Sequence, residues 1–120
     1  EKGMGKMHNQ LMGVSCMDNP EIAATASPIK FVNEDFPPAY FLQGVQDRII
    51  PYTQSVSMVR MINEKCGEGH AELKLFPNAD HGAAEMKTDE EVDLILDFID
   101  RHIWEGEHLR TPLPKEIALL

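Results

Sequence analysis

The sequence predicts an α/β fold, with parallel strands flanked by helices, because short apolar runs alternate with stretches of helical periodicity. The runs span residues 39–42 and 71–76, and each is followed by turn-forming residues such as Gly, Pro and Asn. Helical periodicity occupies the intervals after them, 52–66 and 88–103. Strand, helix, strand and helix in this order is typical of a right-handed parallel unit.

The first predicted strand is the continuous apolar run 39–42, as expected for a strand that is covered on both faces. Gly44 then allows the chain to turn. The helix predicted from Tyr52 onward has Gly67 as a natural stop. Its apolar positions at helical spacing are Val56, Val59 and Ile62.

The second predicted strand, 71–76, alternates polar and apolar residues, so we expect one wetter face and a position near a sheet edge. The last helix opens on a capping box, with Thr88 at the N-cap and Glu91 three residues later. Its apolar residues are expected on a single stripe. They are Val92, Ile95, Leu96, Ile99 and Ile103.

Length and composition indicate one globular domain. The chain has 120 residues, of which 42% are apolar and 26% charged. Its 20 acidic and 11 basic residues give a formal net charge of −9. This surplus disfavours polyanionic partners, and the sequence has no cluster of Lys and Arg to bind a phosphate backbone. We therefore expect no nucleic-acid partner.

No segment of the sequence is apolar enough for a membrane span, which needs roughly 18 consecutive apolar residues. The cysteines Cys16 and Cys66 are too few for a disulfide framework and are expected to be free thiols. The sequence does not decide between a cytoplasmic and a secreted protein.

An acidic residue and a histidine each follow one of the predicted strands. Asp47 lies a few residues after the first strand and His81 a few residues after the second, 34 residues later. Because the carboxyl ends of parallel strands meet at one edge of a sheet, both side chains are expected at the same rim. A carboxylate there can hold one imidazole nitrogen while the other nitrogen takes a proton.

The residues around both positions resemble segments of a known superfamily. Residues 37–52 resemble the Gly-x-x-Asp-x-hydrophobic-hydrophobic-Pro acid segment of α/β-hydrolase esterases, lipases and prolyl-oligopeptidase-like serine hydrolases. Residues 76–82 resemble their histidine segment, and the Ser27–Pro28 pair resembles the Ser-Pro before the acid strand. The resemblance implies that Asp47 is the acid and His81 the base of a Ser-Asp-His triad.

The same resemblance implies how the chain is organised. Residues 1–19 are an N-terminal segment, from a cap or a connecting helix. Residues 20–104 are the C-terminal part of an α/β-hydrolase domain, and residues 105–120 are a C-terminal tail. A Ser-Asp-His triad needs no cofactor, so none is expected.

Some positions depart from the family pattern. Gln43 stands where a histidine often precedes the glycine of the acid segment, and Ala83 follows the His-Gly where an aromatic residue is common. The nucleophile elbow G-x-S-x-G is absent from the sequence. Ser15, in the segment 13–17, has the first glycine but lacks the second and follows no predicted strand, so it is a poor candidate. The cysteines are poorer candidates still.

Two simpler interpretations compete with the triad. Asp47 could cap a turn before the following helix, and His81 could be an ordinary exposed loop residue. A metal site made of His70, Asp80 and His81 has no supporting ligand spacing. We expect no metal.

The leading hypothesis is a serine hydrolase that acts on carboxylic esters, of which this chain carries the acid and the histidine. The chain alone would then be inactive. A prolyl-oligopeptidase-like peptidase is the variant within this class. The alternative is a non-catalytic fragment or assembly module that pairs with another chain, either the missing N-terminal half of a hydrolase or a second copy of itself, because two strands leave open edges.

Overall fold

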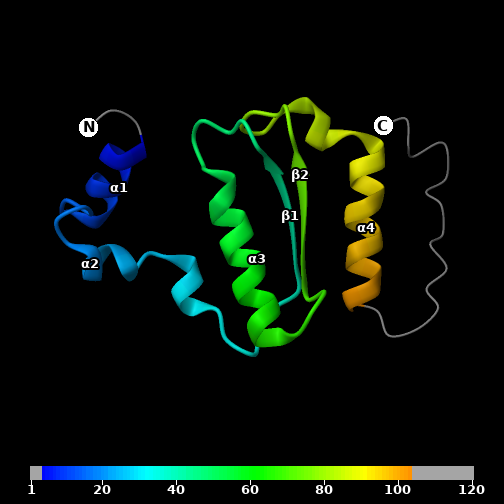
Figure 1. Ribbon diagram of the computed structural model, residues 1–120, viewed down its shortest axis with the longest axis horizontal. Coiled ribbons are helices and arrows are strands. Elements are labelled where there is room, and N and C mark those ends of the chain that lie inside the picture. Colours follow the sequence, from blue (N-terminus) through cyan, green and yellow to red (C-terminus); the bar gives the residue numbers. More distant parts are fainter. Residues whose placement is uncertain (1–3, 104–120) are drawn as a thin grey trace, which may run out of the picture. The chain divides into compact units, whose positions relative to one another are not determined.

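The structure is a computed structural model that describes residues 4–103, and these residues divide after Thr88 into two compact units (Figure 1). Both units contain helices, and the sheet belongs to the first. The first unit contains α1 (Met4–Met12), α2 (Pro20–Ala24), the 3₁₀ turn η1 (Pro28–Phe31), β1 (Ala39–Gly44), α3 (Tyr52–Cys66), β2 (Ala71–Phe76) and the 3₁₀ turn η2 (Ala84–Lys87). The second contains α4 (Asp89–Ile103).

The two strands pair in parallel and α3 connects them, which confirms the predicted α/β fold. Their register places Ala39 opposite Ala71 and Gly44 opposite Phe76, so both strands end at the same level. Figure 1 shows α3 lying along this sheet. β1 extends two residues beyond the predicted run 39–42, because Gln43 and Gly44 continue the pairing with β2.

The core of the first unit lies between α3 and the sheet. Ile62 of α3 is completely buried, and Val32 and Ala71 are buried with it. Partly buried hydrophobic residues surround these three: Phe36, Ala39, Phe41, Met58, Val59, Met61 and Cys66. This packing fixes α3 against the sheet and therefore fixes the separation of the loops at the ends of the strands.

The stripe predicted for α4 is only partly correct. Val92 and Leu96 are 46% and 40% exposed, whereas Phe98, which was outside the predicted stripe, is buried. The apolar side chains of α4 cover a wider arc than one stripe, so the periodicity alone could not choose the buried side. The side chain of Ile103 and the predicted tail, residues 105–120, lie outside the described residues.

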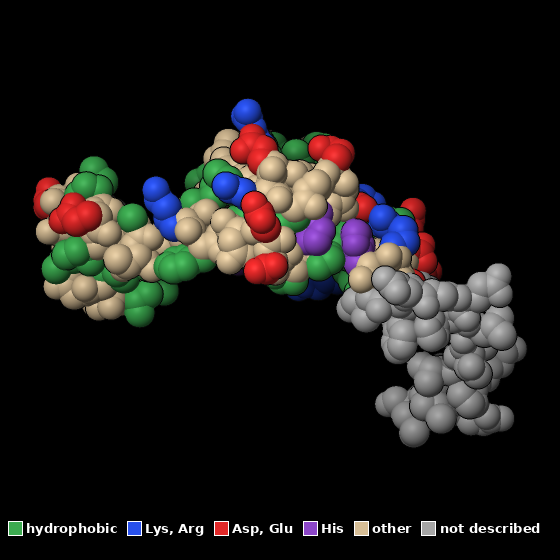
Figure 2. All heavy atoms as spheres, turned by 90° about the horizontal axis from the view of Figure 1, so that it is seen from below, with side chains coloured by type: hydrophobic (Ala, Val, Ile, Leu, Met, Phe, Trp, Pro, Cys, Tyr) green, Lys and Arg blue, Asp and Glu red, His purple; other side chains and the backbone are tan. Residues whose placement is uncertain are grey.

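Among residues 4–103 there is no helix with both the length and the apolar character needed to cross a membrane. The acidic and basic side chains of the visible surface in Figure 2 are interspersed, and Lys and Arg do not gather into one patch on that face.

Candidate active site

Two loops meet at the carboxyl end of the sheet. We call residues 45–51 the acid loop and residues 77–83 the histidine loop. The main-chain N–H of Val45 donates to the carbonyl of Phe76 at 2.9 Å, and the N–H of Gln46 donates to the carbonyl of Ala79 at 3.0 Å. The parallel pairing thus continues past the strands, and it holds the two loops together before any side chain of the site is considered.

Gly44, the last residue of β1, permits this close approach. A Cβ atom at this position would lie 2.3 Å from the carbonyl oxygen of Ala79 and 3.0 Å from that of Asp80. Both atoms belong to the backbone of the histidine loop, which cannot give way as a side chain could. Only glycine therefore fits at this position without displacing the loop.

The structure brings Asp47 and His81 together. Oδ2 of Asp47 lies 2.9 Å from Nδ1 of His81. The Asp47 side chain is buried, with 4% of its surface exposed, whereas the His81 side chain is 53% exposed. The carboxylate is therefore fixed beneath the ring, and the ring reaches the surface.

The contact with Asp47 favours one tautomer of the His81 imidazole. An ionised carboxylate has no proton to donate, so Nδ1 must carry the hydrogen of this bond. In the neutral ring Nε2 then keeps a lone pair. Within residues 4–103, Nε2 has no hydrogen-bond partner. This nitrogen is therefore available to accept a proton from a group outside the described residues.

Asp47 is held by residues that follow it in the acid loop. Its Oδ1 accepts hydrogen bonds from the main-chain N–H groups of Ile49 and Ile50, both at 2.8 Å. Burial opposes ionisation of the Asp47 carboxyl, but the bonds from Ile50, His81, Ile49 and Gln43 outweigh it and hold the pKa well below the usual value. Asp47 is consequently ionised throughout the neutral range.

Gln43 supports the carboxylate from within the sheet. Its Nε2 donates to Oδ2 of Asp47 at 2.9 Å and lies 3.3 Å from the carbonyl of Ile50. Its Oε1 accepts from Oγ of Ser55 on α3 at 2.9 Å. An amide donor that does not titrate thus occupies the position where the related acid segments often have histidine, and it links the acid loop to α3.

Asp80 and Arg48 form a second link between the loops. Oδ1 of Asp80 accepts from the main-chain N–H of Arg48 at 3.1 Å and from that of His81 at 2.8 Å. Oδ2 accepts from Nε of Arg48 at 2.6 Å and also pairs with Nη2. The bonds from His81 and Arg48 lower the pKa of the Asp80 carboxyl, although its partial burial opposes them.

The hollow beside His81 is shallow and open, with a volume of about 400 Å³. It is lined by Arg48, Ile49, Asp80 and His81. None of these residues is a serine or a cysteine, so the described part of the chain offers no nucleophile in this hollow.

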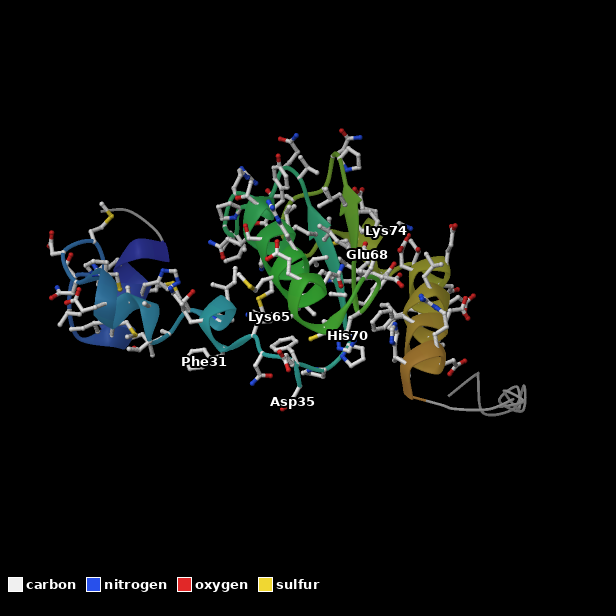
Figure 3. The ribbon with its side chains drawn as sticks, turned by 60° about the horizontal axis from the view of Figure 1, so that its bottom comes forward. Phe31, Asp35, Lys65, Glu68, His70 and Lys74 are labelled. Carbon is white, nitrogen blue, oxygen red and sulfur yellow. The ribbon has the colours of Figure 1, made fainter. Side chains whose placement is uncertain are left out.

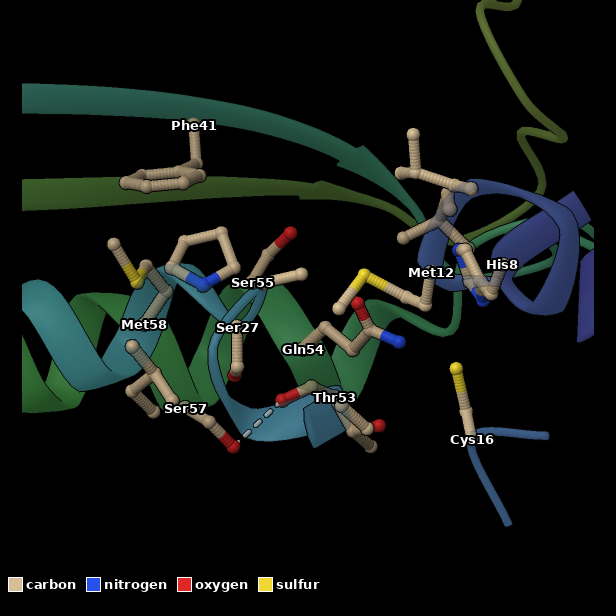
Figure 4. A pocket seen from close by; sticks show the side chains of 16 residues that line it. His8, Met12, Cys16, Ser27, Phe41, Thr53, Gln54, Ser55, Ser57 and Met58 are labelled. Atoms are coloured by element: carbon tan, nitrogen blue, oxygen red, sulfur yellow. Dashed lines mark hydrogen bonds between the residues drawn. The ribbon is translucent and has the colours of Figure 1, made fainter. Parts of the chain in front are cut away.

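A second cavity of the first unit, about 770 Å³, is lined by four hydroxyl-bearing side chains, two of which are used in other contacts (Figure 4). They are Ser27, Thr53, Ser55 and Ser57. Ser55 donates to Gln43, and Ser57 donates to the carbonyl of Thr53 at 2.9 Å. Ser15 lies between α1 and α2 rather than between a strand and a helix, so it does not sit in a nucleophile elbow. Its carbonyl accepts a hydrogen bond from the side-chain amide of Asn19.

The residues of the alternative metal site are not brought together. His70 precedes β2, and its Nε2 lies 2.7 Å from the carbonyl of Phe36, whereas Asp80 and His81 follow the other end of the strand. Figure 3 shows His70 near Lys65, where α3 ends. Within residues 4–103 no group of three His, Cys, Asp or Glu side chains is arranged to hold a metal ion.

The thiol of Cys66 lies close to main-chain carbonyls, among them that of Asn33 at 3.3 Å.

Comparison with known proteins places this chain in a family. The BD-FAE family model matches residues 1–62, a range that includes β1 and Asp47. The chain belongs to the BD-FAE family. This is an α/β-hydrolase-like esterase family, which confirms the superfamily suggested by the acid and histidine segments.

A curated protein whose sequence is similar to part of this chain is named as an esterase. The esterase LipQ of Mycobacterium tuberculosis (strain ATCC 25618 / H37Rv) is 29% identical over 86 residues, which are 69% of this chain and 20% of LipQ. The chain therefore spans about one fifth of the length of the curated relative that it matches. Together these similarities place the chain in an esterase-like hydrolase family.

Two links in the site were not predicted from the sequence. One is the set of bonds between Arg48 and Asp80, and the other is the bond from Ser55 to Gln43. A signal for the first pair was present, because a basic residue follows Asp47 and an acidic one precedes His81. Because Asp47 and His81 are expected at one rim, their oppositely charged neighbours Arg48 and Asp80 can also be expected to pair there. The link from Gln43 to Ser55 had no such signal.

Substitution of Gly44 tests the close approach of the two loops. In Gly44→Ala the new Cβ would overlap the carbonyl of Ala79, so we expect the free energy of unfolding to fall by about 1–3 kcal/mol. Urea denaturation measures this change. The control is Gly5→Ala on α1, where a Cβ meets no atom within 4 Å and alanine should be neutral or stabilising. Equal stability of the two variants would contradict the model of the loop contact.

Acid unfolding tests the environment of Asp47. Because its pKa is lower in the folded protein than the usual 3.8, the resulting stability is present above about pH 4 and is lost as the pH falls further. In Asp47→Asn we expect the free energy of unfolding to depend less on pH between pH 6 and pH 2.5 than in the unaltered chain, as measured in urea.

The control for this measurement is Asp35→Asn. Asp35 is exposed, and its carboxylate has no hydrogen-bond partner among the described residues. This variant should keep the original pH dependence. If Asp47→Asn also keeps it, the carboxylate is not stabilised as described.

Proposed function

We propose that this chain carries the acid and the base of a serine hydrolase that cleaves carboxylic esters. The observation that carries the proposal is the 2.9 Å contact between Oδ2 of Asp47 and Nδ1 of His81, whose side chain is about half exposed. Membership of an esterase-like family supports the choice of ester hydrolysis. The nucleophilic serine would lie on polypeptide outside residues 4–103.

In this proposal His81 acts as a general base and then as a general acid. Nε2 takes the proton from the serine Oγ while Oγ forms a bond to the ester carbonyl carbon. As the tetrahedral intermediate collapses, Nε2 returns the proton to the departing alcohol oxygen. Water then repeats the two steps on the acyl-enzyme and releases the acid. Asp47 stabilises the imidazolium formed in each step and remains ionised itself.

The geometry favours this cycle because the two sides of the imidazole have different environments. Asp47 is buried and held by several donors, so it does not move when the ring gains a proton. His81 lines an open hollow together with Arg48 and Ile49, where a substrate and a nucleophile can enter. A peptidase of the prolyl-oligopeptidase type would use the same two residues, and the described contacts do not distinguish its substrate.

The test is ester hydrolysis by the full-length hydrolase that contains this segment, with p-nitrophenyl acetate and butyrate as substrates. We expect His81→Ala to lower kcat by about 10²–10⁴-fold, since the general base is lost. Asp47→Asn should lower kcat as well, because an amide can favour the wrong tautomer of His81.

The matched control is His70→Gln, in which an amide can still donate to the carbonyl of Phe36 at the other end of the sheet. Its activity should be unchanged. A fluorophosphonate probe should label one serine outside residues 4–103, and labelling should disappear in His81→Ala. Full activity of His81→Ala, or labelling of Ser15, would overturn the proposal.

A second proposal concerns assembly, and it is compatible with the first. The sheet of the described residues has two strands, so the edge of β1 that faces away from β2 pairs with no strand there. Near it, the cavity of about 770 Å³ is lined largely by apolar side chains, among them Leu11, Ile29 and Phe41. We infer that the remaining N-terminal half of the hydrolase covers this edge and this cavity.

Sedimentation of the 120-residue chain alone tests this proposal. We expect self-association or aggregation that increases with concentration, together with no turnover of p-nitrophenyl esters, because exposed strand edges and apolar surfaces pair with other chains. Addition of the N-terminal half should produce one complex of fixed stoichiometry. A compact monomer at every concentration would contradict the assembly proposal and leave the catalytic proposal to its own test.

A further inference from the structure

We propose that Asp80 is a positioning residue that sets the distance between Asp47 and His81 by binding the main chain of both loops. This inference rests on the proposed function, since it assigns a role within the same site. Oδ1 of Asp80 accepts the main-chain N–H of Arg48, the residue after Asp47, and the main-chain N–H of His81. One carboxylate oxygen therefore bridges the backbone next to the acid and the backbone of the base.

The other carboxylate oxygen adds the guanidinium of Arg48. Oδ2 accepts from Nε at 2.6 Å and pairs with Nη2. This ion pair neutralises the charge of Asp80 in the immediate neighbourhood of the imidazole. Asp47 is consequently left as the carboxylate that contacts the ring itself.

The histidine loop needs such a link because little else fixes the ring. Within the described residues the His81 side chain is bonded to Asp47, and the ring is about half exposed. Gly82, which follows directly, has a φ of 62° and a Cβ there would meet no atom within 4 Å. Ala79 is buried, but it lies two positions before His81 in the chain. The hydrogen bond from the His81 N–H to Asp80 restrains the backbone of His81 directly.

An ordinary surface ion pair on the same unit offers a comparison. Arg60 and Glu64 pair at 3.1 Å, four residues apart on α3, and among residues 4–103 neither side chain hydrogen-bonds to the backbone of another element. Exposed pairs of this kind contribute little to stability. Asp80 differs because two of its bonds go to main-chain groups of separate loops, so its loss changes loop geometry as well as charge.

The experiment compares three variants of the full-length hydrolase with the control Glu64→Gln. Asp80→Ala removes the bridge and the ion pair, and it should lower kcat by about 10–100-fold with little change in KM, because a small misplacement of the base slows the chemical step. Arg48→Met removes only the ion pair and should have a much smaller effect. Asp80→Asn keeps one oxygen acceptor for the main chain, so its kcat should lie between the other two.

A second readout follows the His81 ring directly. In the ¹⁵N-labelled full-length hydrolase, NMR should show Nδ1 of His81 protonated and strongly hydrogen-bonded in the unaltered protein and in Glu64→Gln. In Asp80→Ala the two neutral tautomers should approach equal populations, although far-UV circular dichroism stays the same. If Asp80→Ala instead loses its structure, its far-UV dichroism signal falls. In that case the tautomer populations of His81 are measured in Asp80→Asn, and populations equal to those of the unaltered protein contradict the positioning role.

The outcomes separate this inference from the proposed function. If His81→Ala abolishes turnover but Asp80→Ala behaves like Glu64→Gln in kcat and in the NMR spectrum, the positioning role is wrong and the catalytic proposal stands. If His81→Ala keeps its activity, the catalytic proposal fails. Equal kcat values for Asp80→Ala and Arg48→Met would assign the effect to the ion pair and overturn the main-chain bridge.

Discussion

The close approach of Gly44 to the carbonyl of Ala79 is the constraint on which the rest of the site depends. It allows the pairing of β1 with β2 to continue into the acid loop and the histidine loop, through the bonds of Val45 and Gln46. Side-chain contacts then act over distances that the backbone has already set. The buried contacts of Ile62 with its neighbours keep α3 in place and so maintain the register that both loops share.

Two carboxylates near one imidazole would compete if their surroundings were alike. Asp47 is buried and directs Oδ2 at the ring, whereas Asp80 is partly exposed and directs its oxygens at main-chain N–H groups and a guanidinium. Both have lowered pKa values, although the donors differ. The distribution of donors, more than the distance to His81, assigns a separate role to each acid.

Much of this arrangement can be predicted from the sequence. The apolar runs and the helical spacing around Ile62 indicate β1, α3 and β2, and parallel strands must bring Asp47 and His81 to one rim. The bond from Ser55 to Gln43 cannot be predicted in this way, because it depends on rotamers and on the rotation of α3 about its axis. The exposure of Val92 on α4 was missed for a related reason, since periodicity defines an apolar arc without saying which part of it is covered.

Both residues of the site lie on consecutive elements of the chain, which affects how the site folds and how it is inherited. Asp47 and His81 lie on one β1–α3–β2 unit of consecutive elements, and 34 residues separate them. Contacts between residues so near in sequence require the closure of a short loop, which favours their early formation. In the proposed hydrolase both residues are also encoded within one short stretch, so a recombination event upstream of β1 would exchange other parts of the protein while it transferred this pair intact.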